Sequence, residues 1–149
     1  MDRRMVFVET QSQEMRRLLC RWVEFFYEKG LRVQVLTDST MGAQHLDQML
    51  WTFSQPSFVP HRIFGPGESL PAEEPVLITA SPRFLEGFDV LACDATPDVS
   101  ILFRYPHTIH FIVMDDEDRR RASRLLWQKA RDAGLELRHF RLQANEPAA

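Results

Sequence analysis

Apolar residues along this chain recur in two alternating patterns: short runs typical of buried strands, and longer stretches at helical spacing. Residues 5–9 form the first short run and predict a strand, whereas the apolar positions that follow, up to Lys29, repeat every three or four residues and predict a helix. Residues 33–36 predict a second strand, and the stretch from Ser39 through Trp51 predicts a second helix. The chain is therefore expected to open as strand, helix, strand, helix.

Polar residues beside these two helices have the spacing that helix termini use. Thr10 and Gln13 match a capping box for the first helix, and Gly30 suits the position after its C-cap. Ser39 can cap the second helix. Trp51 is expected to close that second helix on the core.

The middle of the chain contains one irregular segment and two strong strand signals. Residues 54–75 are rich in proline and glycine, so we expect a long irregular connection with one short strand near residues 62–64. Residues 75–79 and 88–93 are continuous apolar runs bounded by turn residues, the pattern of central strands covered on both faces. Residues 97–105 suit either a short helix or a turn.

The last third of the chain continues the alternation. Residues 108–114 predict a strand, Asp116 is expected to start a helix that ends near Gly134, and residues 135–142 alternate as a final strand does. Strands that alternate with helices form a mostly parallel or mixed sheet. The sequence therefore predicts one domain, residues 1–142, with an α/β fold: a three-layer Rossmann-like sandwich with helices on both faces of the central sheet.

Composition narrows the class of protein. A chain of 149 residues with 44% apolar and 26% charged residues is typical of one soluble globular domain, here with residues 143–149 as a frayed tail. No stretch approaches the roughly 20 apolar residues that a membrane helix needs, and no signal segment opens the chain, so we expect a cytoplasmic protein without membrane contact. The net charge of -3 argues against a protein whose main task is to grip a nucleic-acid backbone.

Motifs for cofactor or metal chemistry are missing from the sequence. The first strand-helix junction has no glycine that would let the backbone approach a pyrophosphate, and the G-x-G at residues 65–67 is interpreted as a turn. His107 and His110 are three apart in an extended segment, which puts their side chains on opposite faces. Cys20 and Cys93 have no neighbouring thiol and are expected to be buried. We therefore expect no cofactor and no metal.

Three aspartates leave an enzymatic alternative open. Asp94, Asp115 and Asp116 follow predicted strands, at the edge of the sheet where α/β enzymes keep catalytic acids. Helix capping explains Asp115 and Asp116 as well. The alternative to a binding protein is thus a small α/β hydrolase-type enzyme that uses these strand-end aspartates.

Positive charge gathers near the end of the chain. Residues 119–141 contain eight of the 18 basic residues and only two acidic ones. The predicted helix in this region has a core-facing stripe of Ala122, Leu125, Leu126, Ala130 and Ala133. Trp127 lies about 100 degrees around the helix from Leu126. Its neighbours on the helix surface are Ser123, Arg124, Gln128 and Arg131.

Several interpretations of this aromatic residue among cations stay open. In one, Trp127 packs sideways against a neighbouring element and the arginines form a solvated face. In another, Trp127 and Arg124 form an anchor pocket, because Trp and Arg are enriched at binding hot spots and a guanidinium group suits a carboxylate. Such a pocket would bind an acidic peptide with an apolar end. A third is direct binding of single-stranded DNA, which the acidic total disfavours.

One further segment carries a resemblance to a known family. Leu50-Trp51 ends a predicted helix and is followed six residues later by Ser57-Phe58-Val59-Pro60-His61 and a glycine-bearing loop. Together with residues 75–78 and the closing order of strand, basic helix, Ala133-Gly134 and final strand, this segment resembles the chi subunit of the bacterial DNA polymerase III holoenzyme. The similarity covers nearly the whole chain in element order and is specific in residues 51–61.

The resemblance implies a non-catalytic accessory subunit in DNA replication that links the clamp-loader assembly to single-stranded-DNA-binding protein. Chi proteins bind the acidic, phenylalanine-ended C-terminal tail of that protein, and many also bind the psi subunit; contact with DNA itself is expected to be indirect or weak. Arg124, Trp127 and Phe58 match the family's tail site, and Gln128 and Arg131 complete the predicted site. Gln128 stands where the family often presents a lysine, so one expected carboxylate contact is missing.

Overall fold

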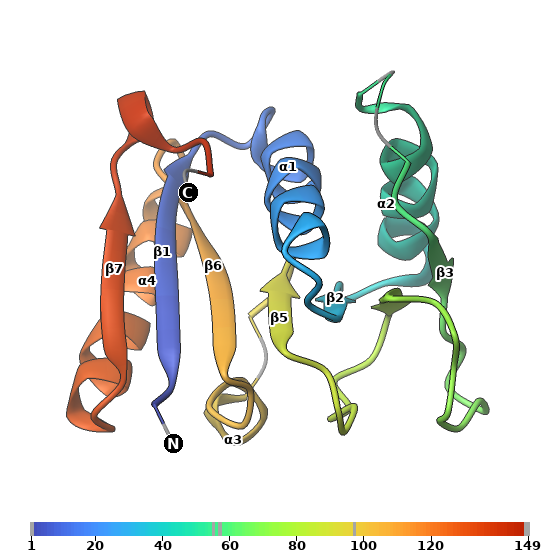
Figure 1. Cartoon of the computed structure of the whole chain (residues 1–149). Coiled ribbons are helices and arrows are strands. Elements are labelled where there is room, and N and C mark those ends of the chain that lie inside the picture. The colour runs from blue at the N-terminus through green and yellow to red at the C-terminus, as the bar shows by residue number, and fades with distance from the viewer. Residues whose placement is uncertain (1, 55, 57, 97, 148–149) are drawn as a thin grey trace.

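The computed structural model describes residues 2–54, 56, 58–96 and 98–147. Seven strands form one sheet in the order β3-β4-β2-β5-β6-β1-β7 (Figure 1). The strands are β1 Arg4–Thr10, β2 Val33–Leu36, β3 His61–Ile63, β4 Val76–Thr79, β5 Val90–Cys93, β6 His107–Val113 and β7 Glu136–Phe140. Every neighbouring pair of strands is parallel, so the expected α/β sheet is confirmed and the mixed alternative is not adopted.

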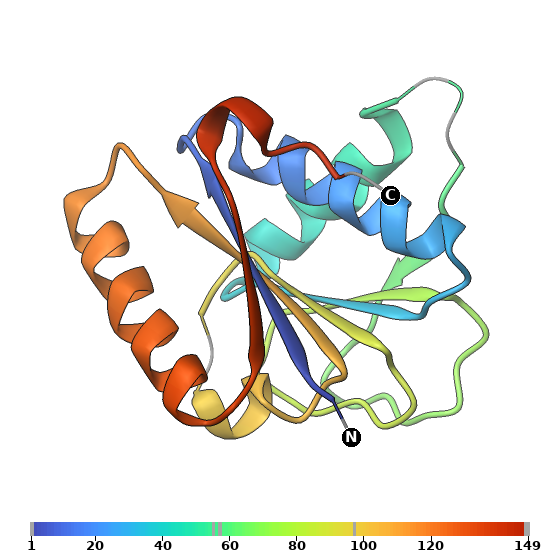
Figure 2. The ribbon, with the colours of Figure 1, turned by 60° about the vertical axis from the view of Figure 1, so that its left-hand side comes forward.

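Helices cover both faces of this sheet, as the three-layer Rossmann-like prediction requires (Figure 2). The helices are α1 Met15–Glu28, α2 Thr40–Thr52, α3 Val99–Leu102 and α4 Glu117–Asp132, followed by the 3-10 turn η1 Leu142–Ala144. Side chains of α1 and α2 share one apolar core with one face of the strands, and side chains of α3 and α4 share the core on the other face. Among the described helices, none is both long and apolar enough to cross a membrane.

The central strands are buried along their whole length, which explains their continuous apolar runs. All four positions of β2, β4 and β5 are buried. The one polar side chain pointing into this core from β2 is Gln34, whose amide donates hydrogen bonds of 2.9 Å to Thr79 Oγ1 and to the Arg83 carbonyl. Its own carbonyl oxygen accepts from the Tyr105 hydroxyl. Burial of this amide is therefore offset by hydrogen bonds at both of its ends.

Helix termini confirm two of the three capping predictions and correct the third. Ser39 caps α2 by accepting from the Gly42 amide at 2.9 Å, and Gly30 follows α1 with a positive φ of 80°. The capping box of Thr10 and Gln13 is wrong: Glu14 is the N-cap of α1 and makes no side-chain cap. The reason is that Thr10 is the fully buried last residue of β1, which keeps its hydroxyl away from the start of the helix.

Two predictions of buried side chains are also corrected. In α4 the buried stripe is Ser123, Leu126 and Ala130, whereas Ala122, Leu125 and Ala133 are exposed, Leu125 to 55%. The helix is turned so that a small hydroxyl, and not Leu125, faces the sheet. Trp51 is 47% exposed and does not close α2 on the core, because its ring lies over His61 and Phe58 at the edge of the molecule.

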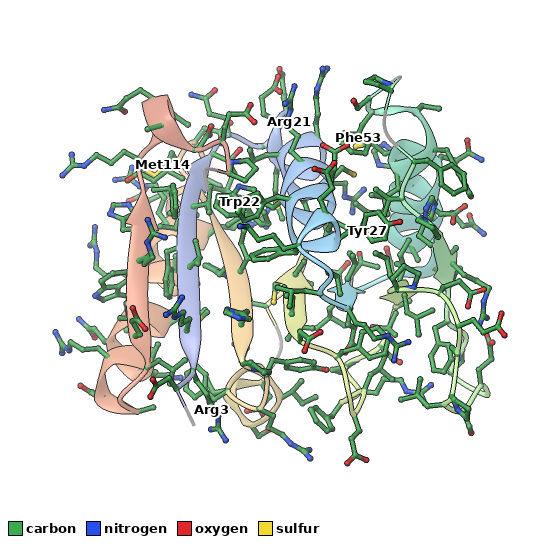
Figure 3. The ribbon with its side chains drawn as sticks, viewed as in Figure 1. Arg3, Arg21, Trp22, Tyr27, Phe53 and Met114 are labelled. Carbon is green, nitrogen blue, oxygen red and sulfur yellow. The ribbon has the colours of Figure 1, made fainter. Side chains whose placement is uncertain are left out.

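The C-terminal segment is held against the domain, so the prediction of a tail frayed from residue 143 onward is wrong for the residues up to 146. Asn145 donates from Nδ2 to the Glu9 carbonyl at 2.9 Å, and its own carbonyl accepts from the Trp22 indole at 3.0 Å. Arg21 and Glu146 form an ion pair of 3.3 Å. Figure 3 places Trp22 on the side of α1 that faces the strands. Residues 148 and 149 lie outside the described residues.

Candidate functional site

A groove lies between α4 and the sheet, near the carboxyl ends of the strands. Its volume is about 300 Å³. Its residues on the sheet side are Phe7, Glu9, Ile112, Met114 and His139, and on the helix side they are Arg120, Ser123, Arg124 and Trp127. Strand alternation puts Phe7 and Glu9 of β1 on the same face, and the parallel register places β6 and β7 on either side of them. On its sheet side the groove is therefore apolar except for Glu9 and His139, and along α4 it is basic.

Trp127 lies half-buried at one end of this groove. Its ring packs edge-on against Phe7 with the centroids 4.9 Å apart, and it lies 6.2 Å from the ring of His139. The sideways packing that one interpretation expected is thus present in the structure, whereas the anchor pocket for a ligand stays a prediction. One part of the indole contacts the sheet, and the remainder lines the groove.

Arginines form the outer wall of the groove. Arg120 and Arg124 line it and also line an adjoining cavity of about 350 Å³, which includes Arg121 and Asp115. Met114 belongs to both cavities; it follows β6, and its amide donates to the Thr10 carbonyl of β1 at 2.8 Å, at the upper end of the strands in Figure 3. Arg121 is engaged on its own helix with Glu117 and Asp118, whereas Arg120 and Arg124 form no ion pair within the described part of the chain. Two guanidinium groups are thus available to a ligand.

Gln128 and Arg131 belong to the same helix but not to the groove. Both are exposed on the outside of α4, and Arg131 lies 3.5 Å from the neighbouring Asp132. Of the five predicted site residues, the structure brings together Arg124 and Trp127. Gln128 and Arg131 flank them on the outer surface.

Phe58 lies elsewhere, and the expectation that it approaches the α4 site is wrong. It precedes β3, and β3 and β7 are the two opposite edges of the sheet. Six strand spacings of about 4.8 Å separate these edges, or roughly 29 Å. Phe58 is 67% exposed and its ring lies 5.7 Å from Trp51. Ser57, at the start of the family-like segment, lies outside the described residues.

Trp51, Phe58 and His61 form a second feature, named here the edge aromatic patch. The His61 ring lies 4.3 Å from the Trp51 ring and is itself buried. Its Nδ1 is 2.7 Å from the Val59 carbonyl and its Nε2 is 2.9 Å from the Asp47 carbonyl. The histidine thus ties the loop before β3 to α2 and fixes the two exposed rings above it.

A buried hydrogen bond holds α4 on the sheet beneath the groove. His110 Nε2 of β6 and Ser123 Oγ of α4 lie 2.7 Å apart. Burial, with a smaller effect from Arg119, lowers the pKa of His110 to about 4, because the apolar surroundings disfavour the imidazolium form. His110 is therefore neutral near pH 7 and serves as a fixed partner for Ser123.

The three strand-end aspartates of the enzymatic alternative have structural partners. Asp94 is buried and accepts from Arg16 Nε and Nη2, both at 3.0 Å, and from Thr37 Oγ1 at 2.8 Å. Asp116 caps α4 by accepting from the Arg119 amide.

Asp115 accepts from the hydroxyl and the amide of Ser12, and these bonds lower its pKa. Among the described residues, no group of three or more His, Cys, Asp or Glu side chains could hold a metal ion. Each of the three aspartates thus has a structural role, because its carboxylate accepts hydrogen bonds that hold neighbouring segments together.

The site residues that sequence reasoning missed come mostly from the strands. Phe7, Glu9 and His139 are brought together only by the pairing of β1 with β7, across about 130 positions of sequence. The alternation of β1 could have grouped Phe7 with Glu9, but not with α4. Arg120 was visible within the basic run and was not singled out.

Comparison with known proteins agrees with this fold and with the earlier resemblance. The family model described as DNA polymerase III chi subunit, HolC, matches residues 2–138. The chain therefore belongs to the DNA polymerase III chi subunit family. No curated protein matched the chain in a sequence search.

Proposed function

We propose that this chi-family protein links the clamp-loader assembly to single-stranded-DNA-binding protein by binding the acidic C-terminal tail of that protein in the α4 groove. The observation that carries the proposal is the pairing of two guanidinium groups, Arg120 and Arg124, with an aromatic floor at Trp127 and Phe7. A peptide with several carboxylates and one aromatic end has the complementary chemistry.

In this proposal the two sides of the groove bind different parts of the peptide. Arg124 and Arg120 take carboxylates, and Trp127 with Phe7 receives the aromatic end in the apolar part of the groove. Gln128 and Arg131, on the outer surface of α4, are positioned to contact only residues further along the tail. Phe58 has no part in this pocket, because it lies at the opposite edge of the sheet.

The edge aromatic patch supplies the second surface that a linking protein needs. Trp51 and Phe58 are exposed and are held in place by His61. The patch lies at the β3 edge of the sheet and the groove lies over β6, β1 and β7, so four to six strand spacings, or roughly 19 to 29 Å, separate them. One molecule can therefore engage two partners at once. In this proposal the patch faces the polymerase assembly, through the psi subunit where one is present.

The test is a fluorescence-anisotropy titration with a labelled acidic peptide ending in Asp-Ile-Pro-Phe. Saturable binding is expected, weaker at moderate salt than at low salt because exposed charges are screened. Arg124→Ala should weaken it at least about tenfold, as loss of a hot-spot cation does. Arg17→Ala is the matched control, since Arg17 is exposed on α1 across the sheet.

Two results would contradict the proposal. One is equal affinity for a peptide that lacks the final phenylalanine. The other is a preference for single-stranded oligonucleotide over the peptide, which would favour direct DNA binding by the same arginines.

A further inference from the structure

One acidic side chain lies within the basic groove. Glu9 extends from the end of β1 on the groove side of the sheet, opposite Arg120 and Arg124 of α4. Its side chain is 16% exposed, so the carboxylate belongs to the wall and not to the outer surface. An acidic ligand that enters this groove therefore meets cations on one wall and an anion on the other.

Hydrogen bonds hold the Glu9 carboxylate in a fixed orientation. Oε2 accepts from His139 Nε2 at 2.7 Å, and Oε1 accepts from the Leu142 amide at 3.1 Å. His139 also lies 6.2 Å from the ring of Trp127, at the aromatic end of the groove. The acid is thus fixed beside the place where an aromatic end residue would sit.

We propose that Glu9, oriented by His139, determines the ligand specificity of the groove by excluding carboxylates from its aromatic end. The inference rests on the proposed peptide-binding function. The ligand class is an acidic peptide whose last side chain is aromatic and uncharged. Its carboxylates lie against Arg120 and Arg124, and only the ring enters between Trp127 and the sheet.

Charge arrangement supports this division of the groove. A carboxylate on the aromatic side chain itself would lie on the side of the Trp127 ring that His139 and Glu9 occupy, and like charges in a partly buried site repel. His139 lies on the Glu9 side of the ring and is already hydrogen-bonded to Glu9. The ligand can therefore satisfy both walls in only one orientation.

The experiment compares the affinities of two labelled peptides for the protein. One ends in Asp-Ile-Pro-Phe, and the other carries 4-carboxyphenylalanine in place of the last residue. The wild type should bind the first peptide at least about tenfold more tightly, and in Glu9→Gln this ratio should fall at least about threefold. The side-chain carbonyl oxygen of glutamine can still accept the hydrogen bond from the Leu142 amide, so the end of β1 is expected to stay in place.

Two substitutions at the partner residue separate charge from structure. His139→Lys adds a cation beside Glu9 and should lower the ratio even though Glu9 is unchanged. His139→Gln leaves the carboxylate without a new cation and should preserve the ratio. Circular dichroism and melting temperature confirm that each variant is folded, and Glu9→Ala replaces Glu9→Gln as the charge-removing variant if the latter does not fold.

The outcomes distinguish this inference from the proposed function. If the wild type binds neither peptide, the proposed function fails and the specificity role fails with it. If the wild type binds the phenylalanine peptide but the ratio is the same in Glu9→Gln as in the wild type, only the role of Glu9 is overturned.

Discussion

Trp127 packs its indole edge-on against Phe7, with the ring centroids 4.9 Å apart, and so joins α4 to β1 at the end of the groove. We predict that Trp127→Ala weakens peptide binding at least about tenfold and lowers the free energy of unfolding by about 2 kcal/mol, less than for a fully buried Trp. Trp127→Phe should recover most of the stability. Peptide titration and urea unfolding measure the two effects, and unchanged affinity in Trp127→Ala would remove Trp127 from the site.

Asp94 holds Arg16 and Thr37 together below the start of α2. We predict that Asp94→Asn lowers the free energy of unfolding by about 3 kcal/mol, because it leaves the guanidinium of Arg16 without its partner. The hydrogen bond to Asp94 also raises the pKa of Arg16, because the carboxylate stabilises the charged guanidinium. Urea unfolding is the measurement, and Asp118→Asn, at an exposed first-turn position of α4, should cost no more than about 0.5 kcal/mol. A fully stable Asp94→Asn would show that this pair is dispensable and would reopen the catalytic reading of Asp94.

His110 should make stability fall with acidification. Its pKa is about 4 in the folded protein and about 6.5 in an unfolded chain, so the unfolded state binds the additional proton between these values. The free energy of unfolding should therefore drop by about 2 kcal/mol from pH 7 to pH 5 through this residue alone. Urea unfolding at both pH values measures the drop, and His110→Gln should lose that part of it. An equal drop in the variant would assign the effect to other groups.

Gly42 is required by the packing at the start of α2. A Cβ at this position would lie 2.4 Å from Thr37 Oγ1 and 3.0 Å from Arg16 Nη2. Both of these side chains donate hydrogen bonds to Asp94. We predict that Gly42→Ala destabilises the protein by about 2 kcal/mol despite the better helix propensity of alanine. Thermal unfolding measures the loss. Gly67→Ala is the matched control, since its Cβ would meet nothing within 4 Å, and a loss of similar size there would argue against a steric cause.

The fold followed from local sequence patterns to a large extent. Continuous apolar runs placed β2 and β4 to within one residue, since strands buried on both faces admit almost no polar side chain. Helical spacing likewise singled out Trp127 among cations. Local pattern does not reveal which face of α4 covers the sheet, and so it wrongly predicts a core position for Leu125, which is exposed. That choice depends on how β6, β1 and β7 pair, which no single segment encodes.

The candidate site shows the same division. Arg124 and Trp127 are neighbours on one helix, and their proximity could be calculated from its geometry. Glu9 and His139 come together only in the folded sheet, and no local sequence pattern near either residue predicts their 2.7 Å hydrogen bond. The placement of Phe58 beside Trp127 was an expectation from family resemblance, and sheet order overrides it.

The position of β1 in the sheet has a consequence for the timing of folding during synthesis. Arg4 pairs with His107 on one side and with Glu136 on the other, so β1 gains both of its neighbours only when residues about 100 to 130 positions later have been synthesised. At roughly 5–20 residues per second, this delay lasts about 5 to 25 s. Pairing between such distant segments also slows folding through the loop that must close. β1 therefore stays with both edges unpaired while most of the domain is synthesised, and the sheet closes on this side only after β6 and β7 have been made.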